Sequence, residues 1–149
     1  MIRKLYVFTD GGARRNPGPA AIGVIIKDSR GKTLAKFGRF IGWATNNVAE
    51  YQAVIEALEW AISNSSLREI SSKCKYQISN INFFLDSKLI VNQLNGLFKI
   101  KNLNLRNLII KIRRLEEKID GKISYYFISR KKNKEADLLV NQVLKRKVF

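Results

Sequence analysis

The sequence predicts an α/β fold of three layers, in which a mixed five-stranded sheet lies between helices. Three β-branched and aromatic runs separated by turn sequences fill the first forty residues, a pattern typical of an antiparallel meander. Strand-length apolar runs then alternate with segments of helical periodicity, which indicates two parallel strands added by right-handed crossovers. A length of 149 residues with 46% hydrophobic content suits one domain spanning 1–149.

The predicted meander begins with a strand at 3–10, which ends in Thr-Asp-Gly-Gly, a sequence that permits a tight turn. A loop, ARRNPGPA, follows at 13–20. Strands at 21–28 and 33–41 flank the turn sequence Ser-Arg-Gly-Lys and form a hairpin.

The rest of the chain supplies the helices and the parallel strands. Apolar residues at helical spacing predict a helix at 46–64, capped by Thr45 or Asn47. After it the pattern predicts a polar connecting loop at 65–80, a strand at 81–86, helices at 87–96 and 105–118, a strand at 123–129 and a helix at 133–146.

Charge limits the partners. The chain has 28 Lys+Arg and 12 Asp+Glu, a formal net charge of +16, which favours a polyanion as partner. Composition alone fits a ribosome-associated protein, a membrane-surface protein or an enzyme. No apolar run approaches the roughly 18 residues of a membrane span, so we expect a cytoplasmic protein.

The catalytic chemistry is restricted by two counts. The chain has no His and a single Cys, Cys74, which excludes Ser-His-Asp and Cys-His catalysis, the usual zinc sites and an internal disulfide. Any reaction must therefore use carboxylates, hydroxyls, Lys or Arg.

Four carboxylates are the candidates, and each has an ordinary explanation. Asp10 can begin a Gly turn, Glu50 can complete a capping box, Asp86 can cap the following helix, and Asp137 lies where a helix dipole favours an acid. Together they fall where this topology brings strand ends and helix starts to one edge. Convergent acids are tolerated chiefly when they bind hard cations, and two Mg²⁺ or Mn²⁺ ions promote phosphodiester hydrolysis without histidine.

The segments TDGGARRNPGPAAIGVII, TNNVAEYQAVIEAL, LDSKLIVNQLNG and ISRKKNKEADLLVNQVL resemble the successive motifs of type 1 ribonuclease H. The resemblance implies endonucleolytic hydrolysis of the RNA strand of RNA/DNA hybrids with two divalent ions, giving 5′-phosphate and 3′-hydroxyl ends. It implies that Asp10 bridges both ions. Glu50 and Asp86 would hold the ion nearer the nucleophilic water, and Asp137 the other.

The resemblance also assigns contacts to the hybrid. Gly11, Asn16, Asn46 and Asn47 resemble the residues that contact RNA 2′-hydroxyls and base edges in the minor groove, where RNA is distinguished from DNA. Thr45 resembles the residue that binds a DNA phosphate. Turn and cap chemistry is the alternative explanation for these side chains.

The chain departs from many members of the family at the loop before the last acid, where they carry a His. Ser129, Arg130, Lys131 and Lys132 stand here, and Arg130 is our candidate substitute. An Arg cannot act as a base at neutral pH, so it would contact phosphate or stabilise the leaving group. The alternative is a solvated run of charge.

A second departure is the short connection LNGLFKIKNLNLR, where several members carry a longer basic protrusion. Residues 97–149 hold fifteen basic and five acidic residues. Lys99, Lys101, Arg106 and Arg113 are therefore candidates for a replacement contact to phosphates.

Two other functions stay open from the sequence alone. One is a binder of hybrids or duplex RNA that keeps the fold without turnover. The other is a related nuclease that acts on duplex RNA or branched DNA. We expect a monomer, and the sequence implies no protein partner.

Overall fold

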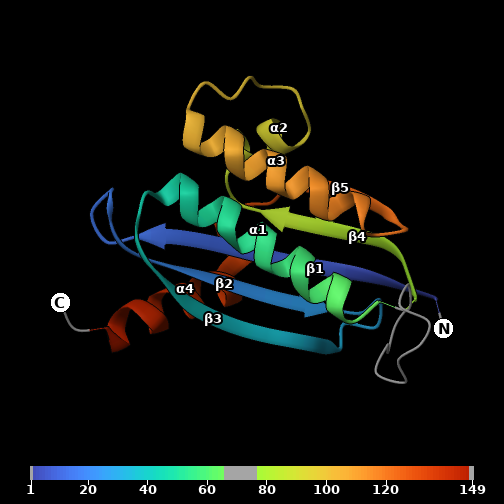
Figure 1. The fold of residues 1–149 in the computed structure, drawn as a ribbon. Coiled ribbons are helices and arrows are strands. Elements are labelled where there is room, and N and C mark those ends of the chain that lie inside the picture. The colour runs from blue at the N-terminus through green and yellow to red at the C-terminus, as the bar shows by residue number, and fades with distance from the viewer. Residues whose placement is uncertain (1, 66–76, 148–149) are drawn as a thin grey trace.

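Within residues 2–65 and 77–147, which this computed structural model describes, five strands form one sheet in the order β3-β2-β1-β4-β5 (Figure 1). The strands are β1 (Ile2–Ala13), β2 (Gly18–Lys27), β3 (Thr33–Ala44), β4 (Gln77–Leu85) and β5 (Lys122–Phe127). β2 pairs antiparallel with both β1 and β3, whereas β4 pairs parallel with both β1 and β5. The predicted mixed sheet is confirmed.

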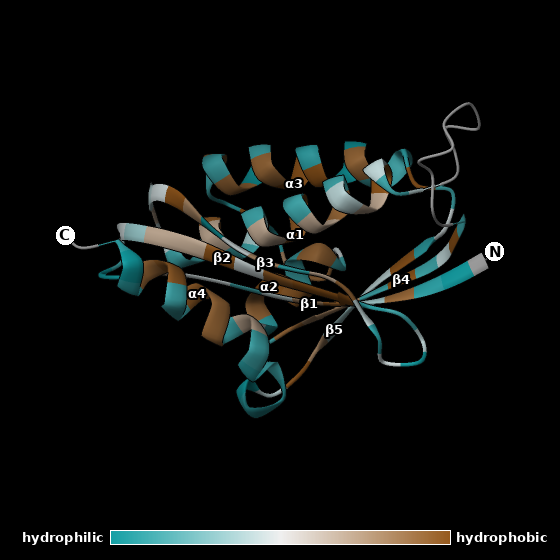
Figure 2. Ribbon diagram, turned by 90° about the horizontal axis from the view of Figure 1, so that it is seen from below, coloured by the Kyte–Doolittle hydropathy of each residue, from teal (hydrophilic) through white to brown (hydrophobic). Residues whose placement is uncertain are grey.

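Helices cover both faces of this sheet, so the three-layer prediction is also confirmed (Figure 2). α1 and α3 lie on one face and α4 on the other. The helices are α1 (Asn46–Ser63), α2 (Lys88–Leu94), α3 (Leu103–Glu117) and α4 (Lys134–Arg146), with a 3₁₀ turn, η1 (Arg130–Asn133), before α4.

Alternation along β1 explains the two layers of core. Leu5 and Val7 are buried and belong to the larger cluster, which the sheet shares with α1 and α3. Phe8 packs on the other side, against Ile25 and the α4 residue Leu139. Because successive side chains of a strand point to opposite faces, a single apolar run supplies both layers.

The structure decides between the two expected caps of α1 and corrects the expected cap of α2. The Thr45 hydroxyl accepts a hydrogen bond from the Val48 amide at 3.2 Å, so Thr45 rather than Asn47 caps α1. The Ser87 hydroxyl accepts from the Ile90 amide at 3.3 Å and caps α2. This cap role leaves the Asp86 carboxylate available for another function.

β4 begins at Gln77, whereas we expected a loop through residue 80. Residues 77–80, which are polar except for the buried Ile78, form a strand because they pair with the first residues of β1 from Ile2 onward. This is a tertiary effect, since the local pattern is weak. Residues 66–76, the rest of the expected loop, lie outside the described part of the chain.

Of the helices in the described residues, none has the length and hydropathy needed to cross a membrane.

Candidate active site

Four carboxylates from four different elements line one cleft. Asp10 comes from β1, Glu50 from α1, Asp86 from the residue after β4, and Asp137 from the first turn of α4. The cleft has a volume of about 470 Å³. The predicted convergence of these four acids is therefore observed.

Asp10 and Asp86 meet because two neighbouring strands end at different points. β4 stops at Leu85, directly before Asp86. β1 continues past Asp10 to Ala13, so our expectation that Asp10 closes its strand is wrong: residues 10–13 stay extended because they pair with 20–23 of β2. Beyond the last β4 pair, Phe8 with Phe84, the edge of β1 is left open for the side chain of Asp86.

Glu50 reaches the cleft because α1 approaches β1 very closely. A Cβ atom added at Gly11 would lie 2.3 Å from the carbonyl carbon of Ala49 and 2.5 Å from the amide nitrogen of Glu50. Only glycine permits this approach. Glu50 is five residues beyond the cap at Thr45 and is buried at 7% exposure, so the capping-box explanation for it is excluded.

Asp137 is positioned by a similar close approach on the other face. A Cβ atom at Gly23 would lie 2.4 Å from the carbonyl oxygen of Ala136, so the N-terminal turn of α4 rests directly on β2. Asn141, one turn later, donates a hydrogen bond to Asp137 Oδ2 at 3.3 Å. The helix dipole favours a carboxylate at this end of α4.

Burial makes the cleft costly for negative charge. Burial, with the charges of Asp86 and Asp137, raises the pKa of Asp10 from 3.8 to about 7. Burial, with the charges of Asp10 and Asp86, raises the pKa of Glu50 well above 4.5, although a hydrogen bond from the Gly11 amide acts in the other direction. Without a counter-charge the site therefore holds protons near neutral pH.

The donor set suits a hard divalent cation. Carboxylate oxygens of Asp10, Glu50 and Asp86 lie within 4.8 Å of one another. Glu50 Oε2 is buried and has no hydrogen-bond partner among the described residues. A buried oxygen without a donor is unfavourable unless a cation or water satisfies it, and oxygen ligands are those that Mg²⁺ and Mn²⁺ prefer.

Asn133 is a site residue that sequence reasoning missed, since we expected only a helix cap. Its side chain makes no cap hydrogen bond. Instead, Asn133 Nδ2 donates to the Thr9 carbonyl at 2.9 Å and to Asp86 Oδ2 at 3.2 Å. The residue is 1% exposed, so it joins η1 to β1 and orients Asp86. In the sequence, an Asn directly before an amphipathic helix fits a helix cap and a buried hydrogen-bond donor equally well.

The residues assigned to hybrid contacts gather at the start of α1. Asn16 Oδ1 accepts from the Asn46 amide at 2.9 Å, and Asn46 Oδ1 accepts from the Ala13 amide at 2.7 Å. Asn16 and Asn46 are exposed. Gly11, Asn46 and Asn47 line the cleft beside the carboxylates. Turn and cap hydrogen bonds thus explain the side chains of Asn16, Asn46 and Thr45. They do not explain Asn47, which lines the cleft.

Arg130 is exposed and also lines the cleft, at the start of η1. Its position is compatible with contact to a bound phosphate. Lys99 and Lys101 are exposed in the segment between α2 and α3 and do not line the cleft. Arg106, at the start of α3, donates its Nε hydrogen to the Ile100 carbonyl.

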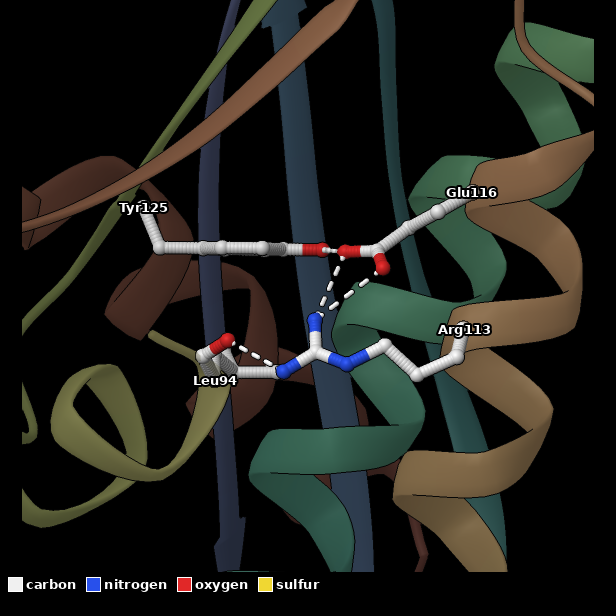
Figure 3. Close-up of polar contacts among 4 residues, drawn as sticks. All are labelled: Leu94, Arg113, Glu116 and Tyr125. Carbon is white, nitrogen blue, oxygen red and sulfur yellow. Dashed lines mark hydrogen bonds and ion pairs between the residues drawn. The ribbon is translucent and has the colours of Figure 1, made fainter. Parts of the chain in front are cut away.

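Arg113 is engaged in a contact network that connects three elements (Figure 3). Its guanidinium bonds both carboxylate oxygens of Glu116, at 3.0 and 3.1 Å, and the carbonyl of Leu94. The buried Tyr125 hydroxyl donates to the same carboxylate at 2.6 Å, and burial raises its pKa well above 10. Arg113 thereby links α2, α3 and β5, a role that the count of basic residues did not indicate.

Comparison with known proteins agrees with this geometry. Residues 8–143 match the family described as reverse transcriptase-like. Ribonuclease HI of Halobacterium salinarum is 34% identical over 95% of this chain and 64% of its own length. Ribonuclease HI of Haemophilus ducreyi is 30% identical over 85% of this chain and 75% of its own length. A bifunctional protein of Mycobacterium tuberculosis is 34% identical, and the match spans only 35% of that protein.

Solved structures give the same result. The crystal structure of RNase H1 from Halobacterium salinarum superposes with a TM-score of 0.81 at 33% identity and covers 99% of this chain and 100% of its own. The compost-derived LC11-RNase H1, solved in complex with an RNA/DNA hybrid, superposes with a TM-score of 0.81 at 39% identity and covers 95% of this chain and 97% of its own. With four carboxylates in one cleft and no His, the chain belongs to the type 1 ribonuclease H family, as a member without an active-site histidine.

Proposed function

We propose that this chain hydrolyses the RNA strand of RNA/DNA hybrids in the presence of two Mg²⁺ or Mn²⁺ ions, giving 5′-phosphate and 3′-hydroxyl ends. The observation that carries the proposal is the convergence of four of only 12 acidic residues into one cleft of a chain with net charge +16. A basic surface binds the nucleic-acid backbone, and the acidic cleft suits cations at the scissile phosphate. The RNase H1 relative solved with a hybrid supports this substrate.

Asp10 would contact both ions, Glu50 and Asp86 one of them, and Asp137 the other. Divalent ions bound there supply Lewis-acid stabilisation of the negative charge that develops on a phosphodiester during hydrolysis. The protein orients the ligands. Asn133 holds the Asp86 carboxylate and Asn141 holds that of Asp137, which fixes the positions that cations require.

Asn47 and Gly11 would contact RNA in the minor groove, because both line the cleft beside Glu50. Arg130 would bind a phosphate next to the scissile bond. A guanidinium donates hydrogen bonds and does not act as a base, so Arg130 would stabilise negative charge and would not transfer a proton.

The decisive experiment uses end-labelled RNA/DNA hybrid, single-stranded RNA, duplex RNA, duplex DNA and a branched DNA, each with Mg²⁺, Mn²⁺ or EDTA. We expect cleavage of the RNA strand of the hybrid alone, lost in EDTA and in Asp10→Asn. End analysis of the fragments checks the expected 5′-phosphate. Glu117→Gln, at an exposed acid outside the cleft, is the matched control and should cleave normally.

Tight binding of the hybrid without cleavage in either metal would contradict the catalytic proposal and favour a non-catalytic binder. Cleavage confined to duplex RNA or branched DNA would instead assign a related nuclease.

The phosphate contact of the segment between α2 and α3 has its own test. Neutralising the exposed cations Lys99, Lys101 and Arg106 should weaken hybrid binding and lower the slope of log affinity against log salt by up to about three. Arg113 is tested separately, since it holds the contact network of Figure 3. An unchanged slope would remove this segment from the binding surface.

A further inference from the structure

A partly exposed aromatic surface lies on the sheet face that carries α4. Tyr6 and Phe8 on β1, Phe84 on β4 and Tyr126 on β5 form it, and we call it the ring row. Phe84 is the central ring: its centroid lies 5.1 Å from that of Phe8, 6.3 Å from that of Tyr6 and 5.6 Å from that of Tyr126. The interplanar angles are between 9° and 26°, so the rings form one stacked array across three strands.

The strand register explains the array. Phe8 pairs with Phe84, and Phe84 with Tyr126, in the parallel ladders of β1, β4 and β5. Paired residues of parallel strands point to the same face. α4 packs on β1, β2 and β3 and lies on the β2 and β3 side of this face (Figure 2). The β5 side of this face is not covered by α4. Tyr126, on the edge strand β5, is the last ring of the array and is 48% exposed.

Polar and basic residues surround the rings. Two residues before Phe8, Phe84 and Tyr126 on their strands, Tyr6 pairs with Asn82, and Asn82 pairs with Ser124. Beyond that row, exposed Lys4 and Lys122 both pair with Asn80. The surface thus combines aromatic faces, amide groups and ammonium groups, unlike the uniformly apolar surface of an obligate protein interface.

The charged run at η1 is divided between two surfaces. Arg130 lines the carboxylate cleft. Lys131, Lys132 and Lys134 instead line a separate pocket of about 250 Å³ with Phe8 at the ring row. Among the described residues, none of these three lysines is ion-paired. Lys27, on the same pocket, is paired with Glu135 at 3.0 Å.

We propose that the ring row binds single-stranded nucleic acid, with a base stacked on the outer face of Tyr126 and phosphates held by Lys131, Lys132 and Lys122. A base would extend an array whose last ring is open to solvent. Stacking on aromatic rings beside basic groups is how open sheets and grooves bind single strands. Both ribose and deoxyribose strands fit this chemistry, because the base face and the phosphate carry it.

The test measures anisotropy of fluorescent 12-mers of rU, dT and an abasic deoxyribose phosphate chain, in EDTA so that no strand is cut. Tyr126→Ala should weaken rU and dT binding about tenfold, the loss of one stacked base, and leave abasic binding unchanged. Tyr126→Phe should bind like the unmodified protein, because the ring face is kept. Lys131→Gln with Lys132→Gln should lower the salt slope for all three strands.

Phe127→Ala is the matched control. Phe127 is the next residue of β5, is 44% exposed, and points to the opposite face because side chains alternate along a strand. It should leave rU and dT binding unchanged. Thermal melting of each variant verifies that it is folded.

Three results would overturn the proposal. They are an unchanged dT affinity in Tyr126→Ala, an equal effect of Tyr126→Ala and Phe127→Ala, or a loss of abasic binding in Tyr126→Ala as large as that of dT. Displacement of dT by polyglutamate with the same dependence on Tyr126 would assign the surface to an acidic protein instead. Cleavage of blunt hybrid, measured in parallel, tests the proposed catalytic function separately from this surface.

Discussion

Replacing Asp10 by Asn should stabilise the protein when divalent cations are removed. Asp10 is 7% exposed, and burial with neighbouring charge raises the pKa of its carboxyl group from 3.8 to about 7. A raised pKa means that the folded state favours the neutral acid. The wild-type protein therefore loses stability as pH rises from about 4 to about 7, the window between the unfolded and folded pKa values.

The magnitude follows from the shift. About three pKa units correspond to about 4 kcal/mol of unfolding free energy above pH 7. This is an upper value, because the asparagine amide loses hydrogen bonds that the acid makes. For a chain of this length each kcal/mol moves the Tm by about 2–4 °C, so the Tm at pH 8 in EDTA should rise by roughly 8–16 °C at most. At pH 4 the gain should disappear.

The assay is thermal melting by circular dichroism at pH 4, 6 and 8, in EDTA and in Mg²⁺. Magnesium should raise the Tm of the wild type, since a ligand of the native state stabilises by mass action. It should raise that of Asp10→Asn much less. The reasoning is refuted if Asp10→Asn melts at or below the wild-type temperature at pH 8 in EDTA, or if its gain is the same at pH 4. Glu117→Gln controls for the loss of one exposed acid.

Three further substitutions test the positioning of the site. Gly11→Ala should lower the free energy of unfolding by about 1–3 kcal/mol through overpacking. It should lower the rate of hybrid cleavage more than the loss of folded protein explains, because α1 must move away from β1. A lowered Tm with normal kcat would contradict this. Asn133→Ala should lower the free energy of unfolding by about 1–3 kcal/mol. It should also reduce kcat with little change in KM, because Asp86 loses its hydrogen-bond donor. If a variant elsewhere with the same stability loses as much kcat, the role of Asn133 is purely structural. Arg113→Gln should lower the free energy of unfolding by only about 1 kcal/mol, because the half-exposed ion pair of Arg113 with Glu116 is partly screened by solvent. It should leave kcat unchanged. A drop in kcat would place Arg113 in the active site.

Local patterns were sufficient for most elements. Helical spacing located α1 and α4, and alternation with flanking turns located the meander, because these signals depend on residues a few positions apart. The strand boundaries were less predictable. β4 starts four residues early and β1 runs three residues past Asp10, and in both cases pairing with a distant strand extends a segment whose own pattern is weak.

The four candidate acids were identified from the sequence, whereas the residue that orients one of them by hydrogen bonds was not. Motif resemblance, a shortage of acids and the absence of His pointed to Asp10, Glu50, Asp86 and Asp137. Asn133 was interpreted as a cap, because its hydrogen bonds reach β1 and Asp86, which are distant in the chain.

The sequence by itself determined the fold class and the exclusion of imidazole chemistry, because these depend on composition and short-range spacing. Its motif resemblance indicated the four carboxylates as candidates. Only the tertiary structure decided how closely α1 approaches Gly11, that Arg113 joins α2, α3 and β5, and that the rings of Phe84 and Tyr126 stack. Those features arise from contacts between residues far apart in the chain, and such contacts are set by how the layers pack.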